Sequence, residues 1–157
     1  MKPKVYIETS IISYLIARPS NDIRVVANQN VTIEWWETRR LGFELFISEF
    51  VIAEASLGNP EAAKKRLEVM AEISELLVTD ESRVLAKALI FEGPIPAKAE
   101  VDALHIAVAA VNGMEYLLTW NCTHIANAVI RPKIEKICRQ QGVESPIICT
   151  PQELMEN

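Results

Sequence analysis

The sequence has few cysteines and no excess of basic residues. Its three cysteines, Cys122, Cys138 and Cys149, are too few and too scattered for a disulfide framework, and no cysteine or histidine pair has the spacing of a zinc site. Lysine and arginine total 16 against 21 acidic residues, so the net charge of −5 argues against a protein held to DNA or to a membrane by charge alone. We expect a reduced, cytoplasmic setting.

Long apolar runs are also lacking. No segment approaches the roughly 18 residues of a membrane helix, so we expect no membrane partner. The N-terminal stretch has two lysines before an apolar run, as a signal peptide does, but Glu8, Thr9 and Ser10 interrupt it and no small-residue cleavage motif follows. We therefore expect this stretch to form a strand and a helix of the folded protein.

The chain does contain enough apolar residues for one core. Of its 157 residues, 50% are hydrophobic and 24% are charged, which predicts a single folded domain over residues 1–157. Five short apolar or β-branched runs lie between helical segments, at residues 4–7, 44–47, 75–78, 115–119 and, more weakly, 146–150. These runs do not alternate polar with apolar residues, which indicates strands covered on both faces. The pattern predicts an α/β sandwich with a parallel sheet.

Helix boundaries are marked by capping signals. Asn59 followed by Pro60 predicts an N-cap and a first-turn proline, and Thr150 with Glu153 predicts a capping box that opens a last helix. Four glycines follow helical patterns at positions that favour left-handed C-caps: Gly58, Gly93, Gly113 and Gly142.

Three acidic residues stand in apolar surroundings. Glu8 ends the first predicted strand, and Glu54 and Asp102 lie in helices that are apolar around most of their circumference. The simpler explanations are a helix-capping acid for Glu8 and a solvated stripe for Glu54. Asp102 is the most informative of the three, because an unpaired buried carboxylate costs several kcal/mol. His105, three residues on, could be its partner, and a metal ion is the functional alternative.

A polar cluster follows the fourth predicted strand. It consists of Thr119, Asn121, His124 and Asn127, in the kind of loop where α/β proteins keep their chemistry. The simpler explanation is a polar turn in which Asn121 or Thr123 caps a helix. Three carboxylates and an amide that converge without a counter-charge would repel one another, so we expect a bound oxygen-ligated cation, Mg²⁺ or Mn²⁺.

Four segments, in order along the chain, resemble the PIN domains that include VapC-like toxin ribonucleases: YIETSIISYL, FISEFVIAEAS, AEVDALHIAVAA and YLLTWNCTHIAN. The resemblance implies a three-layer α/β/α sandwich whose sheet of four to five strands has the flavodoxin-like order 3-2-1-4-5. It also implies an endoribonuclease that uses one or two Mg²⁺ or Mn²⁺ ions to hydrolyse phosphodiester bonds of single-stranded RNA. A small antitoxin and a second copy of the chain are the implied protein partners.

The resemblance assigns roles to individual residues. It places the four catalytic positions of the family on Glu8, Glu54, Asp102 and Asn121, of which Glu8, Glu54 and Asp102 would hold metal. Two of them depart from the family pattern, because Glu8 is one methylene longer than aspartate and Asn121 lacks the charge. The resemblance also implies a hydroxyl beside the first acid, matched by Thr9 or Ser10, and a threonine two residues before the fourth position, matched by Thr119. Apart from the resemblance, His124 could orient phosphate or water, with a helix-surface histidine as the simpler explanation, and Arg18 could contact phosphate.

Basic and aromatic residues are further candidates for contacts. Besides Arg18, the basic residues that could meet phosphate are Arg39 with Arg40, Lys64, Lys65 and Arg66, and Arg131 with Lys133, although such runs are usually solvated faces. Trp35 and Trp36 could form a partner or dimer surface, or could pack in the core.

Two other functions remain open from the sequence. The changes at Glu8 and Asn121 are compatible with a degenerate PIN domain that binds RNA or a protein partner without cleaving it. An unrelated flavodoxin-like or receiver-like module is the third possibility, but its phosphate site would favour a glycine-rich or hydroxyl-rich loop where this chain has only Glu8, Thr9 and Ser10.

Overall fold

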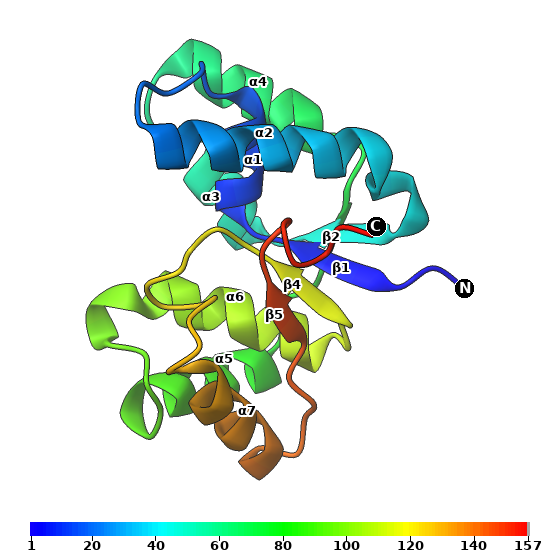
Figure 1. The fold of residues 1–157 in the computed structure, drawn as a ribbon. Helices are drawn as coiled ribbons and strands as arrows, with labels where there is room; N and C mark the ends of the chain where they lie inside the picture. The colour runs from blue at the N-terminus through cyan, green and yellow to red at the C-terminus, as the bar shows by residue number, and fades with distance from the viewer. Residues whose placement is uncertain (157) are drawn as a thin grey trace.

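The computed structural model describes residues 1–156 and places a parallel sheet between two layers of helices (Figure 1). The strands are β1 (Lys4–Ile7), β2 (Glu44–Ile47), β3 (Ser74–Glu75), β4 (Tyr116–Leu118) and β5 (Ile147–Cys149). The 5-stranded sheet has the order β3-β2-β1-β4-β5, and every neighbouring pair is parallel. The expected PIN-like sandwich and its strand order are therefore confirmed.

The helices divide between the two faces of the sheet. One layer contains α1 (Thr9–Ile16), α2 (Ile23–Thr38), α3 (Glu49–Ala55) and α4 (Pro60–Met70), and the other contains α5 (Asp80–Phe91), α6 (Glu100–Val111) and α7 (Arg131–Gln140). Short 3₁₀ turns lie at Arg40–Gly42 and Ala97–Ala99. This arrangement follows from right-handed crossovers between parallel strands.

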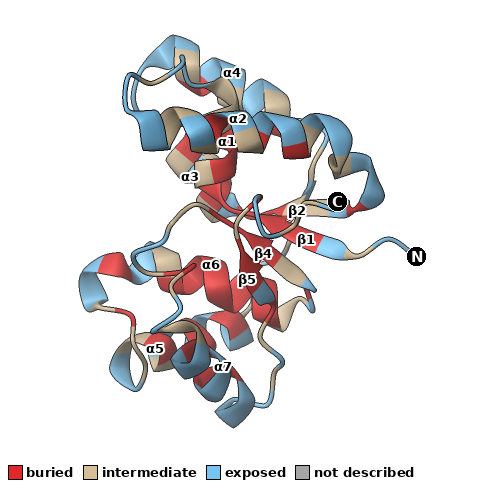
Figure 2. Ribbon diagram, in the orientation of Figure 1, coloured by how far each residue is buried: buried red, intermediate tan, exposed pale blue. Residues whose placement is uncertain are grey.

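The core surrounds the central strand β1. Val5, Tyr6 and Ile7 are fully buried, and Figure 2 shows that buried residues fill the sheet and the inner faces of the helices. Tyr6 is aligned with Phe46 of β2 on one side and with Leu117 of β4 on the other. A strand with helices on both faces needs continuous apolar residues, which explains the missing alternation in the sequence.

Two predicted boundaries are wrong. The third strand was expected at residues 75–78, but it comprises only Ser74 and Glu75, because their partners Phe46 and Ile47 are the last residues of β2. The helix expected after Thr150 is absent from the described residues. The chain forms a turn there, in which the Glu153 carboxylate accepts the Thr150 N–H at 3.1 Å as expected. One such turn is a costly nucleus that does not propagate by itself.

The helix-capping predictions hold at Asn59 and at three of the four glycines, whereas the capping box at Thr150 opens no helix within the described residues. Asn59 accepts the backbone N–H groups of Glu61 and Ala62, and Gly58, Gly113 and Gly142 have φ values of 84°, 72° and 78°. Gly93 does not have a positive φ, so that prediction was wrong. A Cβ there would lie 2.6 Å from the carbonyl oxygen of Leu89, which means that the site requires glycine for close approach rather than for handedness.

The neighbouring tryptophans Trp35 and Trp36 differ in environment. Trp35 is fully buried against Phe43 in the core, which settles the alternative left open for it. Trp36 is half-buried, and the Arg40 guanidinium lies 4.9 Å from its ring centroid. Among residues 1–156, no helix is long and apolar enough to cross a bilayer.

Candidate active site

The four predicted catalytic positions gather around the point where β1 and β4 end side by side, whereas Arg18 lies apart in the loop after α1. Glu8 directly follows β1, and its N–H donates to the carbonyl of Leu118 at 3.1 Å. Thr119 directly follows β4 and donates its N–H to Cys149 at 3.0 Å. The chain leaves β1 toward β2 and β3 and later returns on its other side with β4, so this edge is the switch point where open α/β sheets bind ligands.

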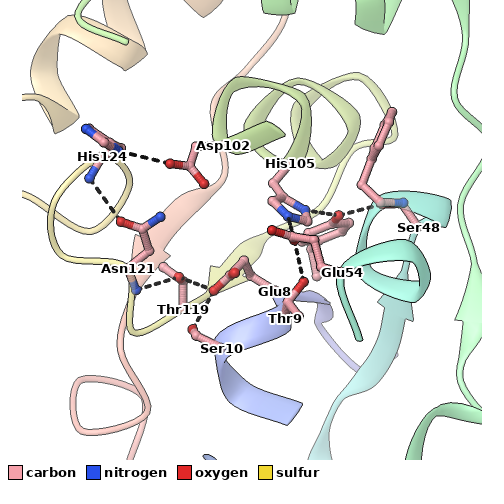
Figure 3. Close-up of polar contacts among 12 residues, drawn as sticks. Glu8, Thr9, Ser10, Ser48, Glu54, Asp102, His105, Thr119, Asn121 and His124 are labelled. Atoms are coloured by element: carbon pink, nitrogen blue, oxygen red, sulfur yellow. Dashed lines mark hydrogen bonds and ion pairs between the residues drawn. The ribbon is translucent and has the colours of Figure 1, made fainter. Parts of the chain in front are cut away.

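Glu8 is held by two hydroxyl groups. Its side chain is buried, and Oε1 accepts hydrogen bonds from Ser10 Oγ at 2.5 Å and from Thr119 Oγ1 at 2.6 Å. Each hydroxyl also accepts a backbone N–H from the loop between β4 and α7, residues 119–130, which we call the β4 loop. Ser10 Oγ accepts from Trp120 at 2.8 Å and Thr119 Oγ1 from Asn121 at 2.9 Å. The loop thus orients both hydroxyls toward the carboxylate (Figure 3).

Glu54 projects from α3 and is held by two other donors. Its Oε1 accepts from Thr9 Oγ1 at 2.6 Å and pairs with His105 Nε2 at 2.6 Å. Partial burial by itself raises the pKa of Glu54, but the interaction of its carboxylate with His105, together with the Thr9 hydroxyl, outweighs it and holds the pKa below its ordinary value. Glu54 is therefore ionised at neutral pH.

A buried hydrogen-bond chain stands behind Glu54. His105 is fully buried in α6, its Nδ1 lies 2.6 Å from the Tyr6 hydroxyl, and that hydroxyl lies 2.7 Å from Ser48 Oγ. Burial raises the pKa of Tyr6, so the phenol keeps its proton. The chain connects three elements, β1, α3 and α6, to one carboxylate.

Asp102 has a different partner from the one considered in the sequence. Its Oδ2 lies 3.0 Å from Nδ1 of His124, whereas His105 pairs with Glu54. Asp102 lies near the start of α6, one turn before His105, and Figure 3 shows it facing the β4 loop. The side chain is 18% exposed, which places it at the rim of the cluster rather than in the core.

Asn121 acts as the cap of the β4 loop. Its Oδ1 accepts the backbone N–H groups of Thr123 at 3.3 Å and His124 at 3.0 Å. This is the polar-turn alternative, and it ties Asn121 to the same loop that carries the partner of Asp102 (Figure 3). The four predicted positions are thus linked through Thr9, Thr119 and His124 by hydrogen bonds and chain neighbours.

The donor set fits a hard cation. Ligand atoms of Glu8, Glu54 and His105 lie within 4.8 Å of one another, and this is the only such group of three within the described residues. Asp102 is not part of it. Within residues 1–156, each of the three carboxylates has one oxygen held by protein donors and the other without a hydrogen bond, and no lysine or arginine pairs with any of them. Carboxylate oxygens that no lysine, arginine or other donor occupies are the ligands that Mg²⁺ and Mn²⁺ prefer.

Three of the eight candidate basic residues hydrogen-bond to other groups of the folded chain. Arg39 pairs with Glu156 at 2.9 Å, Arg131 pairs with Glu153 at 3.3 Å, and Arg66 donates to backbone carbonyls at the end of α3. Arg18 follows α1 and is exposed. It remains available for contact with a ligand.

A surface groove lies elsewhere on the molecule. It has a volume of about 730 Å³ and runs beside β5, where its lining includes Arg131, Arg139 and Ile147. None of the predicted site residues lines it. The groove and the acidic cluster are therefore separate features.

Comparison with known proteins shows the fold. No family model and no curated protein matches the chain. Among solved structures, VapBC2 from Rickettsia felis, bound to a DNA fragment from its promoter, matches with a TM-score of 0.59 at 15% identity, covering 94% of this chain and 98% of that chain. This chain has the VapC fold.

A second structure with the VapC fold matches less of the chain. VapC20 from Mycobacterium tuberculosis, a toxin that cleaves the sarcin-ricin loop, has a TM-score of 0.54 at 15% identity and covers 76% of this chain and 91% of that chain. At a sequence identity this low, the similarity shows a shared fold and does not show a shared chemistry.

The sequence analysis missed the residues behind Glu54. Ser48, Tyr6 and His105 were not assigned to a site, except that His105 was considered as a partner of Asp102. The available signal was a polar group in each of two mostly apolar segments, Tyr6 in β1 and His105 in α6. Buried hydroxyl and imidazole groups need hydrogen-bond partners. Which partner each one has depends on how α6 packs against β1 and α3.

Proposed function

We propose that the chain is a metal-dependent endoribonuclease that hydrolyses single-stranded RNA and acts as the toxin of a toxin-antitoxin pair. The observation that carries the proposal is the set of free carboxylate oxygens on Glu8, Glu54 and Asp102, beside the switch point and, within the described residues, without a lysine or arginine partner. The VapC fold supports the toxin assignment, since VapC20, a toxin that cleaves the sarcin-ricin loop, has this fold.

Glu8 and Glu54 would hold a divalent cation, Mg²⁺ or Mn²⁺, with Asp102 on the neighbouring side. When bound by these residues, a divalent cation would supply a water of lowered pKa and would neutralise charge on the scissile phosphate. Ser10 and Thr119 fix the direction of Glu8, and Thr9 fixes that of Glu54. These contacts leave little reorganisation for the moment of reaction.

The remaining residues would contact or surround the substrate. Asn121 holds the β4 loop in place, and His124, 27% exposed beside Asp102, would orient a phosphate oxygen or a water molecule. Arg18 would meet the phosphate backbone. A small antitoxin, a second copy of the chain and a cytoplasmic location complete the proposal.

The decisive experiment is single-turnover cleavage of a mixed RNA pool with Mn²⁺. It compares wild type, Asp102→Ala and Asn121→Asp, with the exposed Asp80→Ala as the matched control, all purified identically. We expect weak wild-type cleavage that is lost in Asp102→Ala and kept in Asp80→Ala. Asn121→Asp should cleave faster at low Mn²⁺, because the added carboxylate strengthens cation binding. Equal residual rates in all four proteins would indicate a contaminating ribonuclease and overturn the assignment.

A domain that binds without cleaving is the second candidate. It is favoured by the engagement of Asn121 Oδ1 with two backbone N–H groups and by the pairing of Asp102 with His124. Cleavage by the Asn121→Asp variant and by none of the other proteins would support this candidate, since the carboxylate of the family pattern would then be the missing element.

A further inference from the structure

Both ring nitrogens of His105 are occupied. Nδ1 lies 2.6 Å from the Tyr6 hydroxyl, and Nε2 lies 2.6 Å from Oε1 of Glu54. The ring is fully buried, between Phe50 in an edge-to-face contact and Tyr6. No water can therefore substitute for either partner without displacing a side chain.

A count of donors assigns the hydrogens. The carboxylate of Glu54 only accepts, so the contact at 2.6 Å places a hydrogen on Nε2 of His105. A neutral imidazole with that hydrogen accepts at Nδ1, which the Tyr6 hydroxyl satisfies by donating. Ser48 then donates to Tyr6 and itself accepts the backbone N–H of Phe50 at 3.3 Å. Every donated hydrogen in this series of contacts, from Ser48 through Tyr6 and His105 to Glu54, therefore has an acceptor.

The reverse arrangement leaves a gap. A hydrogen on Nδ1 would turn Tyr6 into an acceptor from His105 and force its O–H onto Ser48. Ser48 would then receive two hydrogens, and its own O–H would have no acceptor among the described residues. It would also set the Nε2 lone pair against the Glu54 carboxylate at 2.6 Å. An unsatisfied buried donor is destabilising, so the first arrangement is favoured.

We propose that His105 is a positioning residue that donates to Glu54, and not a ligand of the cation, even though its nitrogen lies within 4.8 Å of ligand atoms of both glutamates. This inference rests on the proposed function, because it concerns the cation that Glu54 would bind. Its consequence is a donor set made of oxygen alone. Such a set favours Mg²⁺ and Mn²⁺ over Zn²⁺, which prefers nitrogen and sulfur.

The first test is made on the metal-free protein. Long-range ¹⁵N–¹H NMR correlations report which imidazole nitrogen carries hydrogen, and the chain has only 2 histidines, so a His124→Gln spectrum assigns them. We expect His105 to carry its hydrogen on Nε2, before and after addition of Mg²⁺. A hydrogen on Nδ1, or loss of the Nε2 hydrogen when Mg²⁺ or Zn²⁺ is added, overturns the inference.

The second test separates donation from ligation. His105→Gln places an amide N–H near the position of Nε2, whereas His105→Leu removes the donor and keeps the bulk. Calorimetric Mn²⁺ titration should show a loss of affinity of about 10- to 100-fold for the leucine variant, the usual effect of removing a residue that orients a ligand, and less than tenfold for glutamine. Equal losses, or a directly bonded nitrogen in the pulsed electron paramagnetic resonance spectrum of Mn²⁺ in wild type, would identify a ligand.

Two controls keep the outcomes apart. Tyr6→Phe retains His105 and the ring of residue 6, so it serves if the leucine variant does not fold, and its His105 should keep the Nε2 hydrogen. Glu54→Gln tests the cation site itself. If wild type takes up neither Mn²⁺ nor Mg²⁺, the proposed metal centre fails, while the NMR result still decides the hydrogen position on His105.

Discussion

At the scale of single residues, the site depends on hydroxyl groups more than on charge pairs. Glu8 is 5% exposed, and its carboxylate is neutralised by no lysine or arginine among residues 1–156. The hydroxyls of Thr119 and Ser10 each accept a backbone N–H and donate to the same carboxylate oxygen of Glu8. This arrangement stabilises a buried carboxylate and leaves its second oxygen free.

Thr119→Val should destabilise the fold by about 1–3 kcal/mol, because it leaves the Asn121 N–H and one contact of Glu8 unsatisfied in a buried site. Urea denaturation measures the change. The matched control is Thr123→Val at an exposed position of the same loop, where we expect almost no effect. Similar losses in the two variants would show that the hydroxyl bridge contributes nothing.

The three cysteines should react unequally. Burial raises the pKa of Cys138 to about 11 and that of Cys149 to about 12, while Cys122 is exposed. Because the thiolate is the reactive form, iodoacetamide at pH 8 should add one group to the native protein and three in urea. Intact mass gives the count, and Cys122→Ser should take up none when native. Two or more native adducts would contradict the burial of these thiols.

The same pKa values set the alkaline limit of stability. Both folded-state values lie above the ordinary thiol value of 9.0, so the folded state holds these protons more tightly than the unfolded chain. The resulting stabilisation is complete below pH 9 and decreases as the pH rises toward 11. Chemical denaturation between pH 8 and 10.5 should show this decrease, and Cys138→Ala with Cys149→Ala should flatten it.

At the scale of elements, the helix ends are specified by local contacts. Asn59 caps α4, and the C-terminal carbonyls of α5 are closed by a tight turn in which the Ile95 N–H donates to Leu89 at 3.1 Å. Gly93 lies inside that turn, against the same carbonyl. The turn directs the chain from α5 into α6, the helix that carries Asp102 and His105.

Gly93→Ala should cost about 1–3 kcal/mol, because the added Cβ would meet a backbone oxygen that cannot move aside. Gly42→Ala is the matched control, since nothing lies within 4 Å of its Cβ position and its φ is not positive. That variant should change stability by less than about 0.5 kcal/mol. Thermal unfolding of both compares them, and equal midpoints would refute the close approach.

At the scale of the whole molecule, the sheet order assembles the site. Glu8 and Asn121 are far apart in sequence, yet β1 and β4 are neighbours, so their ends meet.

The same fold leaves apolar side chains on the outside of α5. Val84 is 56% exposed and Phe91 is 81% exposed, and their spacing of seven residues places them on one stripe.

We predict that the chain forms a homodimer and that this stripe contributes to it. Phe91→Glu should shift the sedimentation coefficient at micromolar concentration from dimer to monomer, because a charge would be buried in the interface. Ile23→Glu, at a residue that is likewise 81% exposed but lies on α2, is the matched control and should remain dimeric. A monomeric wild type would remove the prediction.

The sequence by itself determined the layers of the fold and indicated the residues of the candidate site. Continuous apolar runs such as residues 4–7 specify buried parallel strands whatever their partners are, because a strand between two helical layers has no solvent face. Acidic residues in apolar segments, Glu8, Glu54 and Asp102, identify positions that need a partner. Local capping chemistry was equally readable at Asn59, because an N-cap involves only neighbouring residues.

Only the tertiary structure decided which side chains pair with one another. His105 is three residues from Asp102, a spacing that permits contact on a helix, but packing against β1 and α3 turns it to Tyr6 and Glu54, and Asp102 meets His124 of the β4 loop instead. Gly93 and the two-residue β3 were misread for the same reason. Close approach, strand length and hydrogen-bond partners depend on atoms distant in sequence, which local pattern does not encode.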